Sequence, residues 1–407
     1  MQLGRRSRIT ASLGAGAAVA LLAALVGCGP SADDQPLQFK GGVPVGAVLS
    51  LTSNANAYGQ DQQIGLKLAQ SWFRQRQTAN PQGALKLNLR LEDGGGDEAT
   101  ASQAFNLLID AGMVALIGPT LSQQAFAADP IAQRRGVPVV APSNTATGIP
   151  QIGHFISRVS APSTEIAPLS IAKALQLTPS IRRAAVFYAQ DDAYSTSETA
   201  IFQKALTDKG LKPVTVQRTQ LNDQDFQNQI TAALRETPDL VVISAQAVDG
   251  GNLIRQLREL GYRGAIVVGN GMNTPNIYPI CQAYCDAILI AQAYSPELDT
   301  PVNREFVALY QKAKGGAIPP QLTAQAFTAF QVVGEALQRL NQRQPLAQLS
   351  LQEARKALMA ELLGGRYDTP LGPISFSPDG EVVQQQFHVA QVRMQPGGRS
   401  GRFALLP

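Results

Sequence analysis

Short apolar runs alternate with amphipathic segments along most of the chain. Residues 113–117 (MVALI) are almost continuously apolar, which is typical of a strand buried on both faces of a parallel sheet. Residues 123–135 carry Phe126 and Ile131 among small alanines, so we expect a helix packed against that sheet. A second apolar run, residues 137–141, predicts the next strand.

The same alternation repeats from Val43 onward and predicts an α/β fold with doubly wound parallel sheets and right-handed crossovers. The other expected strands are residues 43–51, 85–91, 184–188, 239–244, 265–269 and 287–292, and β-structure returns at 371–376 and 386–393. Long helices are expected at residues 302–314, 321–342 and 351–363. The chain has two such series of strands and helices, and 407 residues are too many for one hydrophobic core. We therefore expect two lobes with a cleft between their strand ends.

Two finer predictions concern helices beside these strand ends. In the helix after residue 58, Ile64, Leu68 and Trp72 recur at a spacing of four, which predicts one buried face. Residues 249–251 (DGG) are expected to form a turn before a helix at 252–260.

Composition excludes several classes of protein. The chain has 44% hydrophobic and 16% charged residues, which is typical of a folded globular protein. Its formal net charge is +4, but three of those charges are leader arginines (Arg5, Arg6 and Arg8) without a compensating acid. A net charge of +1 on the remainder gives no support for nucleic-acid binding.

The leader predicts export. Three arginines and then an apolar run precede the sequence LVGC at 25–28, so residues 1–27 have the pattern of a secretory signal peptide. The LVGC sequence resembles a bacterial lipobox, which implies a lipid on Cys28 and an anchored protein facing the periplasm or cell exterior. The alternative is ordinary signal cleavage, which leaves Cys28 as a free thiol. The polar residues that follow are expected to form a tether.

The other two cysteines are Cys281 and Cys285. In an exported protein they form either a disulfide that closes a small loop or a pair of reduced core cysteines. A metal site is not expected, because two thiols alone are a poor ligand set and His154 and His388 are distant in sequence.

Hydroxyl residues follow two neighbouring predicted strands: Thr120 and Ser122 follow the first, and Ser143 and Thr145 follow the second. Ligands of open α/β sheets bind at the carboxyl ends of parallel strands, where helix N-termini attract anions. Hydroxyls and amides without a strong base suit the binding of a carboxylate or an amide better than catalysis. The alternative is that these side chains only cap turns and helices.

Signatures of catalysis and of cofactor binding are absent. The chain has no G-x-S-x-G, P-loop, H-E-x-x-H or C-x-x-C motif. Ser170 and Lys173 match S-x-x-K, but the partner K-T-G is missing. We therefore expect neither an enzyme nor a cofactor; an exported hydrolase using Ser122 or Ser170 is the rival interpretation.

Several sequence blocks, in order, resemble the type I periplasmic binding proteins of the leucine/isoleucine/valine-binding family, which serve ABC importers of amino acids and amides. These blocks are GAVLSLTSNANAYG, LEDGGGDEATA, IGPTLSQQAFA, GVPVVAPSNTAT, FYAQDDAYS and TPLGPISFSPDGE. The resemblance extends from Val43 to about Val392.

The resemblance implies two lobes joined by a three-stranded hinge that closes on a small ligand. The implied units are a signal peptide (1–27), a lipidated tether (28–42), a first lobe (43–159 and 293–370) and a second lobe (160–292 and 371–407), with crossings near 159, 292 and 371. A monomer that delivers its ligand to ABC transporter membrane subunits is implied, without nucleic acid. A ligand-sensing lipoprotein for a signalling partner would have the same fold.

The resemblance also implies roles for site residues. Ser122, with Thr120, would clamp the carboxylate of the ligand, and Ser143 and Thr145 would hold its carboxylate and ammonium groups. Tyr58 and Tyr194 would close over its side chain; the alternative is that both are half-buried structural tyrosines. The remaining candidates are polar residues at positions where the family commonly has an aromatic side chain and an acid: Gln246 and Asn270.

Asn270 is a departure, because a carboxamide supplies no charge to an ammonium group. Unless Asp192 or Asp249 points inward, the positive charge of an α-amino acid's ammonium group would lack a negative partner in a closed cleft. The implied ligand is then an amide, a urea-like molecule or another small carboxylate, as an alternative to a neutral or branched-chain amino acid.

Overall fold

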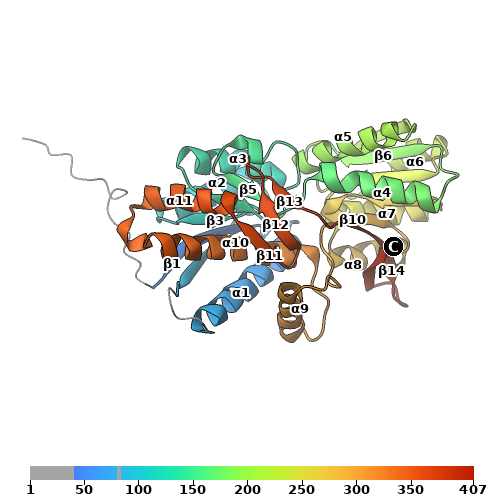
Figure 1. Cartoon of the computed structure of the whole chain (residues 1–407). Helices are drawn as coiled ribbons and strands as arrows, with labels where there is room; N and C mark the ends of the chain where they lie inside the picture. Colours follow the sequence, from blue (N-terminus) through green and yellow to red (C-terminus); the bar gives the residue numbers. More distant parts are fainter. Residues whose placement is uncertain (1–40, 80–83) are drawn as a thin grey trace, which may run out of the picture.

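The computed structural model describes residues 41–79 and 84–407, and the expected signal peptide, Cys28 and all but the end of the tether lie outside this part. Two α/β lobes lie side by side along the long axis of the molecule (Figure 1). Within the described residues, every helix is too short or too polar to cross a bilayer.

Five parallel strands form the sheet of the first lobe, in the order β2-β1-β3-β4-β5. Their bounds are β1 Val43–Leu49, β2 Leu87–Asp93, β3 Ala115–Ile117, β4 Val139–Ala141 and β5 Ile156–Arg158. Helices cover both faces, which explains the apolar runs. One face carries α2 Glu98–Asp110 and α3 Ser122–Arg134, and the other carries α1 Asn56–Ala79, α9 Pro301–Ala313, α10 Gln321–Arg343 and α11 Leu351–Gly364.

Seven strands form the sheet of the second lobe, in the order β15-β14-β10-β9-β8-β6-β7. Their bounds are β6 Ala184–Ala189, β7 Pro213–Thr219, β8 Leu240–Ser244, β9 Ala265–Val268, β10 Leu289–Gln292, β14 His388–Met394 and β15 Gly401–Leu406. The last two are antiparallel, so this sheet is mixed at one edge. One face carries α4 Ser163–Leu177 and α5 Ala193–Asp208, and the other α6 Gln227–Arg235, α7 Ala247–Glu259 and the short α8 Tyr278–Cys281.

A third, antiparallel sheet corrects the expected lobe boundary at residue 371. It consists of β11 Arg366–Thr369, β12 Gly372–Phe376 and β13 Val382–Gln384. Its apolar side chains, Ile374 and Val382 among them, pack in the core of the first lobe. The chain therefore makes its third passage between lobes after Gln384, because the hairpin completes the first core before the chain leaves it.

Strand order places the functional edge. In the first sheet β1 lies between β2 and β3, and in the second β6 lies between β7 and β8, so both sheets reverse direction of winding there. Ligands of open α/β sheets bind at such switch points. Residues that follow β3 and β4 line the same cavity as residues that follow β6 and β8.

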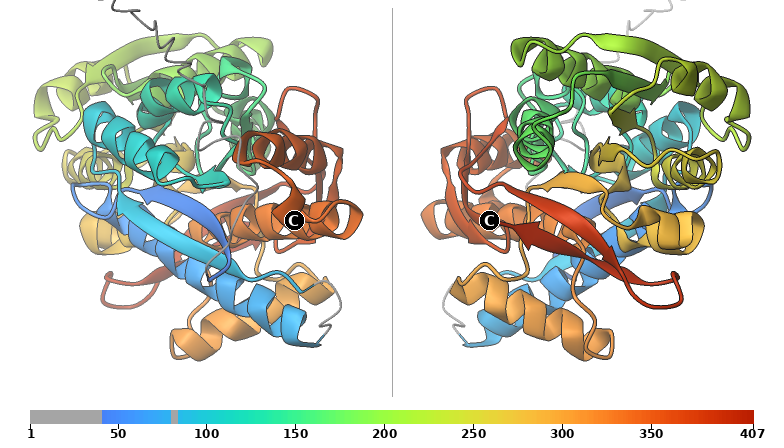
Figure 2. Two further views of the ribbon diagram at one scale, coloured as in Figure 1. Left: turned by 90° about the vertical axis from the view of Figure 1, so that its left-hand side faces the viewer. Right: turned by 90° about the vertical axis from the view of Figure 1, so that its right-hand side faces the viewer.

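Three expectations about helices are wrong. On α1 the buried face includes Leu66, Ala69 and Phe73 together with Trp72, whereas Ile64 and Leu68 are half-buried. This helix packs along α10, and Figure 2 shows α1 and α9 together at one side of the molecule in both views.

Phe126 is 40% exposed, because the small side chains of α3 are the ones that face the sheet. Helix α7 begins at Ala247, and the glycines expected in a turn lie inside it. A Cβ atom on Gly250 would lie 2.3 Å from the sulfur of Met272, so glycine permits this close packing.

The sequence prediction also missed whole strands, including β5, β7 and β15. Strand β7 (PVTVQRT) lies at the edge of its sheet and is half polar, so it lacks the continuous apolar run of the central strands.

Candidate functional site

One cavity between the lobes brings together all the candidate ligand-binding residues. They are Tyr58, Thr120, Ser122, Ser143, Thr145, Tyr194, Gln246 and Asn270. Leu121, Asp192, Gly271 and Leu322 complete the lining. The cavity volume is about 40 Å³, which restricts the site to a small molecule.

Ser122 is the first residue of α3, whose N-terminus points at the cavity edge. Its hydroxyl oxygen accepts a hydrogen bond from the backbone N–H of Ala146 at 3.3 Å, which leaves its proton free to donate. Unpaired N–H groups and the helix dipole favour a negative group at this position.

The hydroxyls of Thr120 and Ser143 are engaged within the protein. Thr120 donates to Oε1 of the buried Gln62 at 2.6 Å, and Nε2 of Gln62 donates to the hydroxyl of Ser143 at 2.7 Å. Ser143 in turn donates to the carbonyl of Thr120 at 2.7 Å. Gln62, which sequence reasoning missed, therefore ties the two strand-end loops together and fixes their backbone at the cavity.

Thr145 is the opposite case. Its hydroxyl is buried and has no hydrogen-bond partner in the described part of the chain. Buried hydroxyls are ordinarily paired, so an unpaired one at a cavity wall is a candidate ligand contact.

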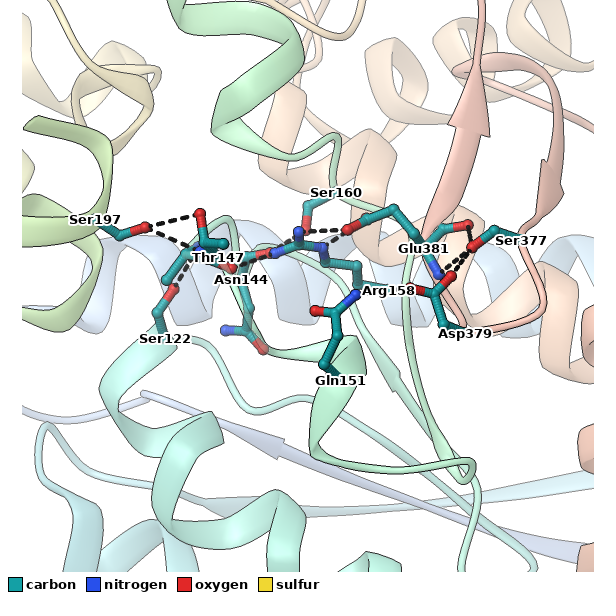
Figure 3. Close-up of polar contacts among 11 residues, drawn as sticks. Ser122, Asn144, Thr147, Gln151, Arg158, Ser160, Ser197, Ser377, Asp379 and Glu381 are labelled. Atoms are coloured by element: carbon teal, nitrogen blue, oxygen red, sulfur yellow. Dashed lines mark hydrogen bonds and ion pairs between the residues drawn. The ribbon is translucent and has the colours of Figure 1, made fainter. Parts of the chain in front are cut away.

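An ion pair holds the turn that carries Thr145 (Figure 3). Nη1 of the buried Arg158 donates to the carbonyls of Asn144 and Ala146 at 3.0 and 2.8 Å, which flank Thr145 on both sides. Arg158 also forms a bidentate pair with Glu381 at 2.7 and 2.6 Å. Neither residue was a sequence candidate, because they are 223 positions apart and lie outside the cavity lining.

In the second lobe a buried acid supports the turn at Asn270. Glu198 accepts hydrogen bonds from the Tyr194 hydroxyl at 2.6 Å and from the Asn270 N–H at 3.0 Å. The Tyr194 hydroxyl accepts from the Gly271 N–H at 2.6 Å. A Cβ atom on Gly269 would lie only 1.7 Å from Oε2 of Glu198, so this acid can lie against the strand end only because glycine is there.

The side-chain oxygen of Asn270 already has a partner within the protein, since Oδ1 accepts a hydrogen bond from Nε2 of Gln321 at 3.0 Å. The turn therefore presents a neutral amide to the cavity. The charged member of the lining is Asp192, which is 1% exposed. Its Oδ2 accepts from the N–H of Ser195 at 3.3 Å, as the N-cap of α5, while Oδ1 has no partner in the described residues.

Tyr58 joins the two lobes. From α1 of the first lobe, its hydroxyl donates to the carbonyl of Gly271 at 2.5 Å and accepts from the N–H of Ala247 at 2.6 Å. Burial raises the pKa of Tyr58, so the hydroxyl stays protonated and able to donate. Its ring and that of Tyr194 both line the cavity.

Further hydrogen bonds cross the gap around this tyrosine. The N–H of Thr147 donates to the Ser197 hydroxyl at 2.9 Å (Figure 3). Thr274 and Asn276 of the second lobe donate to Asp61 of α1 at 3.4 and 3.3 Å. The structure is thus a closed form, with bonds on several sides of the cavity.

The S-x-x-K residues, the two histidines and the paired cysteines lie outside the cavity lining. Ser170 donates to the carbonyl of Ala167 and Lys173 to that of Pro407, so the S-x-x-K residues serve the packing of α4. Neither His154 nor His388 lines the cavity. Cys281 and Cys285 are joined by a disulfide, and the described residues contain no cluster with the composition of a metal site.

The fold and the site together define a class of protein. Two α/β lobes, joined by three chain passages, enclose a polar cavity and are held shut by hydrogen bonds across it. This is the architecture of a two-lobed solute-binding protein, in which hinge motion opens and closes the site.

The chain belongs to the periplasmic binding proteins, whose family model matches residues 42–399. Members of this family are binding proteins that work outside the cytoplasm. Among curated relatives, the Leu/Ile/Val-binding protein BraC3 of Rhizobium johnstonii is 22% identical over 350 residues, covering 85% of this chain and 90% of BraC3.

Solved structures agree in fold. The leucine-binding protein LivK of Thermotoga maritima is 24% identical, with a TM-score of 0.76, covering 89% of this chain and 98% of LivK. A solute-binding protein of an ABC transporter from Rhodopseudomonas palustris, in complex with 3,4-dihydroxybenzoic acid, is 20% identical, with a TM-score of 0.76, covering 89% and 96%. Similar folds therefore occur in proteins for an amino acid and for an aromatic acid.

Proposed function

We propose that this protein is the extracytoplasmic solute-binding component of an ABC importer and captures a small carboxylate-bearing solute between its lobes. The observation that carries the proposal is the pairing of two available hydroxyls, on Ser122 and Thr145, at the N-terminus of α3 and on the adjacent turn. The named relatives, which bind branched-chain amino acids or aromatic acids, support a ligand with a carboxylate.

The ligand is held by its polar head in the first lobe, while Tyr58 and Tyr194 enclose the rest of it. Because the cross-lobe hydrogen bonds exist only in the closed form, ligand binding shifts the population toward closure. The closed surface is then what the membrane subunits of the importer recognise.

The proposal includes a location. Residues 1–27 direct export, Cys28 carries the lipid, and the following tether links a monomeric two-lobed body to the membrane. Mass spectrometry of the membrane-bound protein tests this, because a lipid on Cys28 adds the mass of the acyl chains, and Cys28→Ser would release the protein.

Binding is tested by thermal unfolding of the protein with amino acids, amides, urea and short or aromatic carboxylates. A ligand at a hundred times its dissociation constant adds about 2.7 kcal/mol to the free energy of unfolding. Hydrogen bonds from each hydroxyl to a carboxylate contribute about 1.5–3 kcal/mol. Ser122→Ala and Thr145→Ala are therefore each expected to weaken the best ligand about 10- to 150-fold.

Ser170→Ala is the matched control, because it removes a buried hydroxyl that bonds only within α4. It should bind the ligand like the parent protein, and no hydrolysis of amides or esters is expected from either. Unchanged affinity in both the Ser122 and Thr145 variants would show that the site lies elsewhere.

A further inference from the structure

A row of side-chain amides connects the hinge between the lobes to the cavity wall. Gln321, the first residue of α10, is buried and lies outside the cavity lining. Its Nε2 donates to Oδ1 of Asn270 at 3.0 Å, and its Oε1 accepts from Nδ2 of Asn273 at 3.0 Å. Oδ1 of Asn273 accepts in turn from Nε2 of Gln292, where β10 ends and the chain leaves the second lobe. Because α10 belongs to the first lobe and both asparagines belong to the second, Gln321 joins the lobes beside the cavity.

Two backbone groups fix the direction in which these amides point. Oε1 of Gln321 also accepts from the N–H of Ala293 at 2.8 Å, just after β10. Nδ2 of Asn273 also donates to the carbonyl of Ala291 at 3.3 Å. A backbone N–H only donates and a carbonyl only accepts, so turning either amide around would place two donors or two acceptors against each other. The oxygen of Gln321 therefore faces the hinge, and its NH2 group faces Asn270.

The orientation of Gln321 sets that of Asn270 in the cavity wall. Since Oδ1 of Asn270 accepts the hydrogen bond from Gln321, its NH2 group is the part left for a ligand. The backbone of this turn is held separately, because the Asn270 N–H donates to the buried Glu198 at 3.0 Å. The turn therefore offers hydrogen-bond donors to the cavity, where an ionised acid would offer only acceptors.

We propose that Gln321 is a positioning residue that keeps the NH2 group of Asn270 available to the cavity, and that the protein thereby selects a solute with a neutral carbonyl oxygen besides its carboxylate. The inference rests on the proposed function, because it assigns a second polar contact of the same solute. When the lobes close on a solute that lacks this oxygen, water is excluded and the donors of Asn270 stay unpaired, which is costly. Asp192 lies in the same lining, and its acid disfavours a second carboxylate as the acceptor.

The test uses pairs of probes that have the same shape and differ at one oxygen. 4-Oxopentanoate and 5-oxohexanoate are compared by titration calorimetry with 4-methylpentanoate and 5-methylhexanoate, in which a methyl group and a hydrogen replace the ketone oxygen. L-2-Amino-4-oxopentanoate is compared with L-leucine in the same way. In at least one pair the ketone should bind the parent protein at least ~5-fold more tightly, because its partner leaves the donors of Asn270 unpaired.

Gln321→Met is the decisive variant, since methionine has a similar length but neither donates nor accepts through an amide. The carboxamide of Asn270 is then free to turn its oxygen to the cavity, and the preference for the ketone should fall below ~2-fold. The N–H of Ala293 also loses its acceptor, which weakens closure equally for both members of a pair. The ratio of the two affinities within a pair therefore reports the orientation of Asn270 and not the strength of closure.

Gln325→Met is the matched control. It makes the same substitution one turn further along α10, at a buried residue outside the cavity lining whose side-chain oxygen has no partner in the described part of the chain. It should keep the preference of the parent protein. Asn270→Leu is a second variant, of similar volume, that removes the donors themselves and should also abolish the preference for the ketone.

The outcomes separate this inference from the proposed function. If Gln321→Met or Asn270→Leu keeps the preference of the parent protein, the inference is wrong. It is also wrong if the parent protein binds both members of every pair equally while Ser122→Ala weakens them, and the proposed function then stands. If none of the six probes binds, the inference is wrong, and the thermal-unfolding screen alone decides the proposed function.

Discussion

The hydroxyl of Tyr58 offers a direct test of whether the lobes close as the structure shows. Tyr58→Phe keeps the ring in the cavity wall and removes only the oxygen that bonds Gly271 and Ala247 in the other lobe. In the open form the Gly271 carbonyl and the Ala247 N–H are hydrated, so removing the Tyr58 hydroxyl destabilises the closed form alone. Two hydrogen bonds of about 0.5–1.5 kcal/mol each amount to about 1–3 kcal/mol, or ~5- to 150-fold in ligand affinity.

The assay is titration calorimetry with the best ligand, together with small-angle scattering to follow closure. Tyr294→Phe is the control, since the hydroxyl of Tyr294 is buried and has no hydrogen-bond partner in the described part of the chain. We expect the Tyr58 variant to bind more weakly and to need more ligand to become compact, and the Tyr294 variant to match the parent protein. Equal affinity in all three would refute the assignment of Tyr58 as the bond between lobes.

Two more predictions concern the ion pair and the buried acid. Arg158→Gln removes the charged donor of the Ala146 carbonyl and of Glu381, while the Asn144 carbonyl keeps the hydrogen bond from the Ser160 hydroxyl. The free energy of unfolding by urea should therefore fall by about 3 kcal/mol, and ligand affinity should fall with the loosened turn at Thr145. A change below about 1 kcal/mol would show that other contacts hold the turn. Burial raises the pKa of Asp192 in the cavity wall to about 7. A ligand that pairs with the ionised carboxylate should therefore bind up to about tenfold more tightly for each unit of pH increase up to pH 7, and its affinity should level off above pH 7. In Asp192→Asn this dependence should disappear, and a parent profile that is flat from pH 5 to 8 would contradict an ionised Asp192 in the complex.

The sequence by itself determined the α/β class and the edge of the sheets where the site lies. Apolar runs such as residues 113–117 specify strands buried on both faces, and the strand end followed by Thr120 and Ser122 lies at the edge that lines the cavity. These features are local, since they depend on residues within one strand and the turn after it. The resemblance of whole sequence blocks then located the remaining candidates, which line one cavity.

Local patterns were less informative about which apolar side chains are buried in the core. Phe126 looked like a core residue, yet it is exposed, because the space under α3 admits only small side chains. The boundary after β13 was misplaced for a related reason. The hairpin near the end of the chain belongs to the first lobe because it packs against residues hundreds of positions earlier in the sequence, and a local pattern cannot reveal such contacts.

Only the tertiary structure decided which polar atoms are available to a ligand. Thr120 and Thr145 are equivalent in sequence, but Gln62 engages the first, while Arg158 holds the backbone around the second and leaves its hydroxyl unpaired. Likewise, Asp192 faces the cavity because α5 begins there and Ser195 fixes one of its oxygens. Gln62 and Thr120 are 58 positions apart and Arg158 and Glu381 are 223 apart, so a sequence pattern that spans a few residues cannot assign these hydrogen bonds.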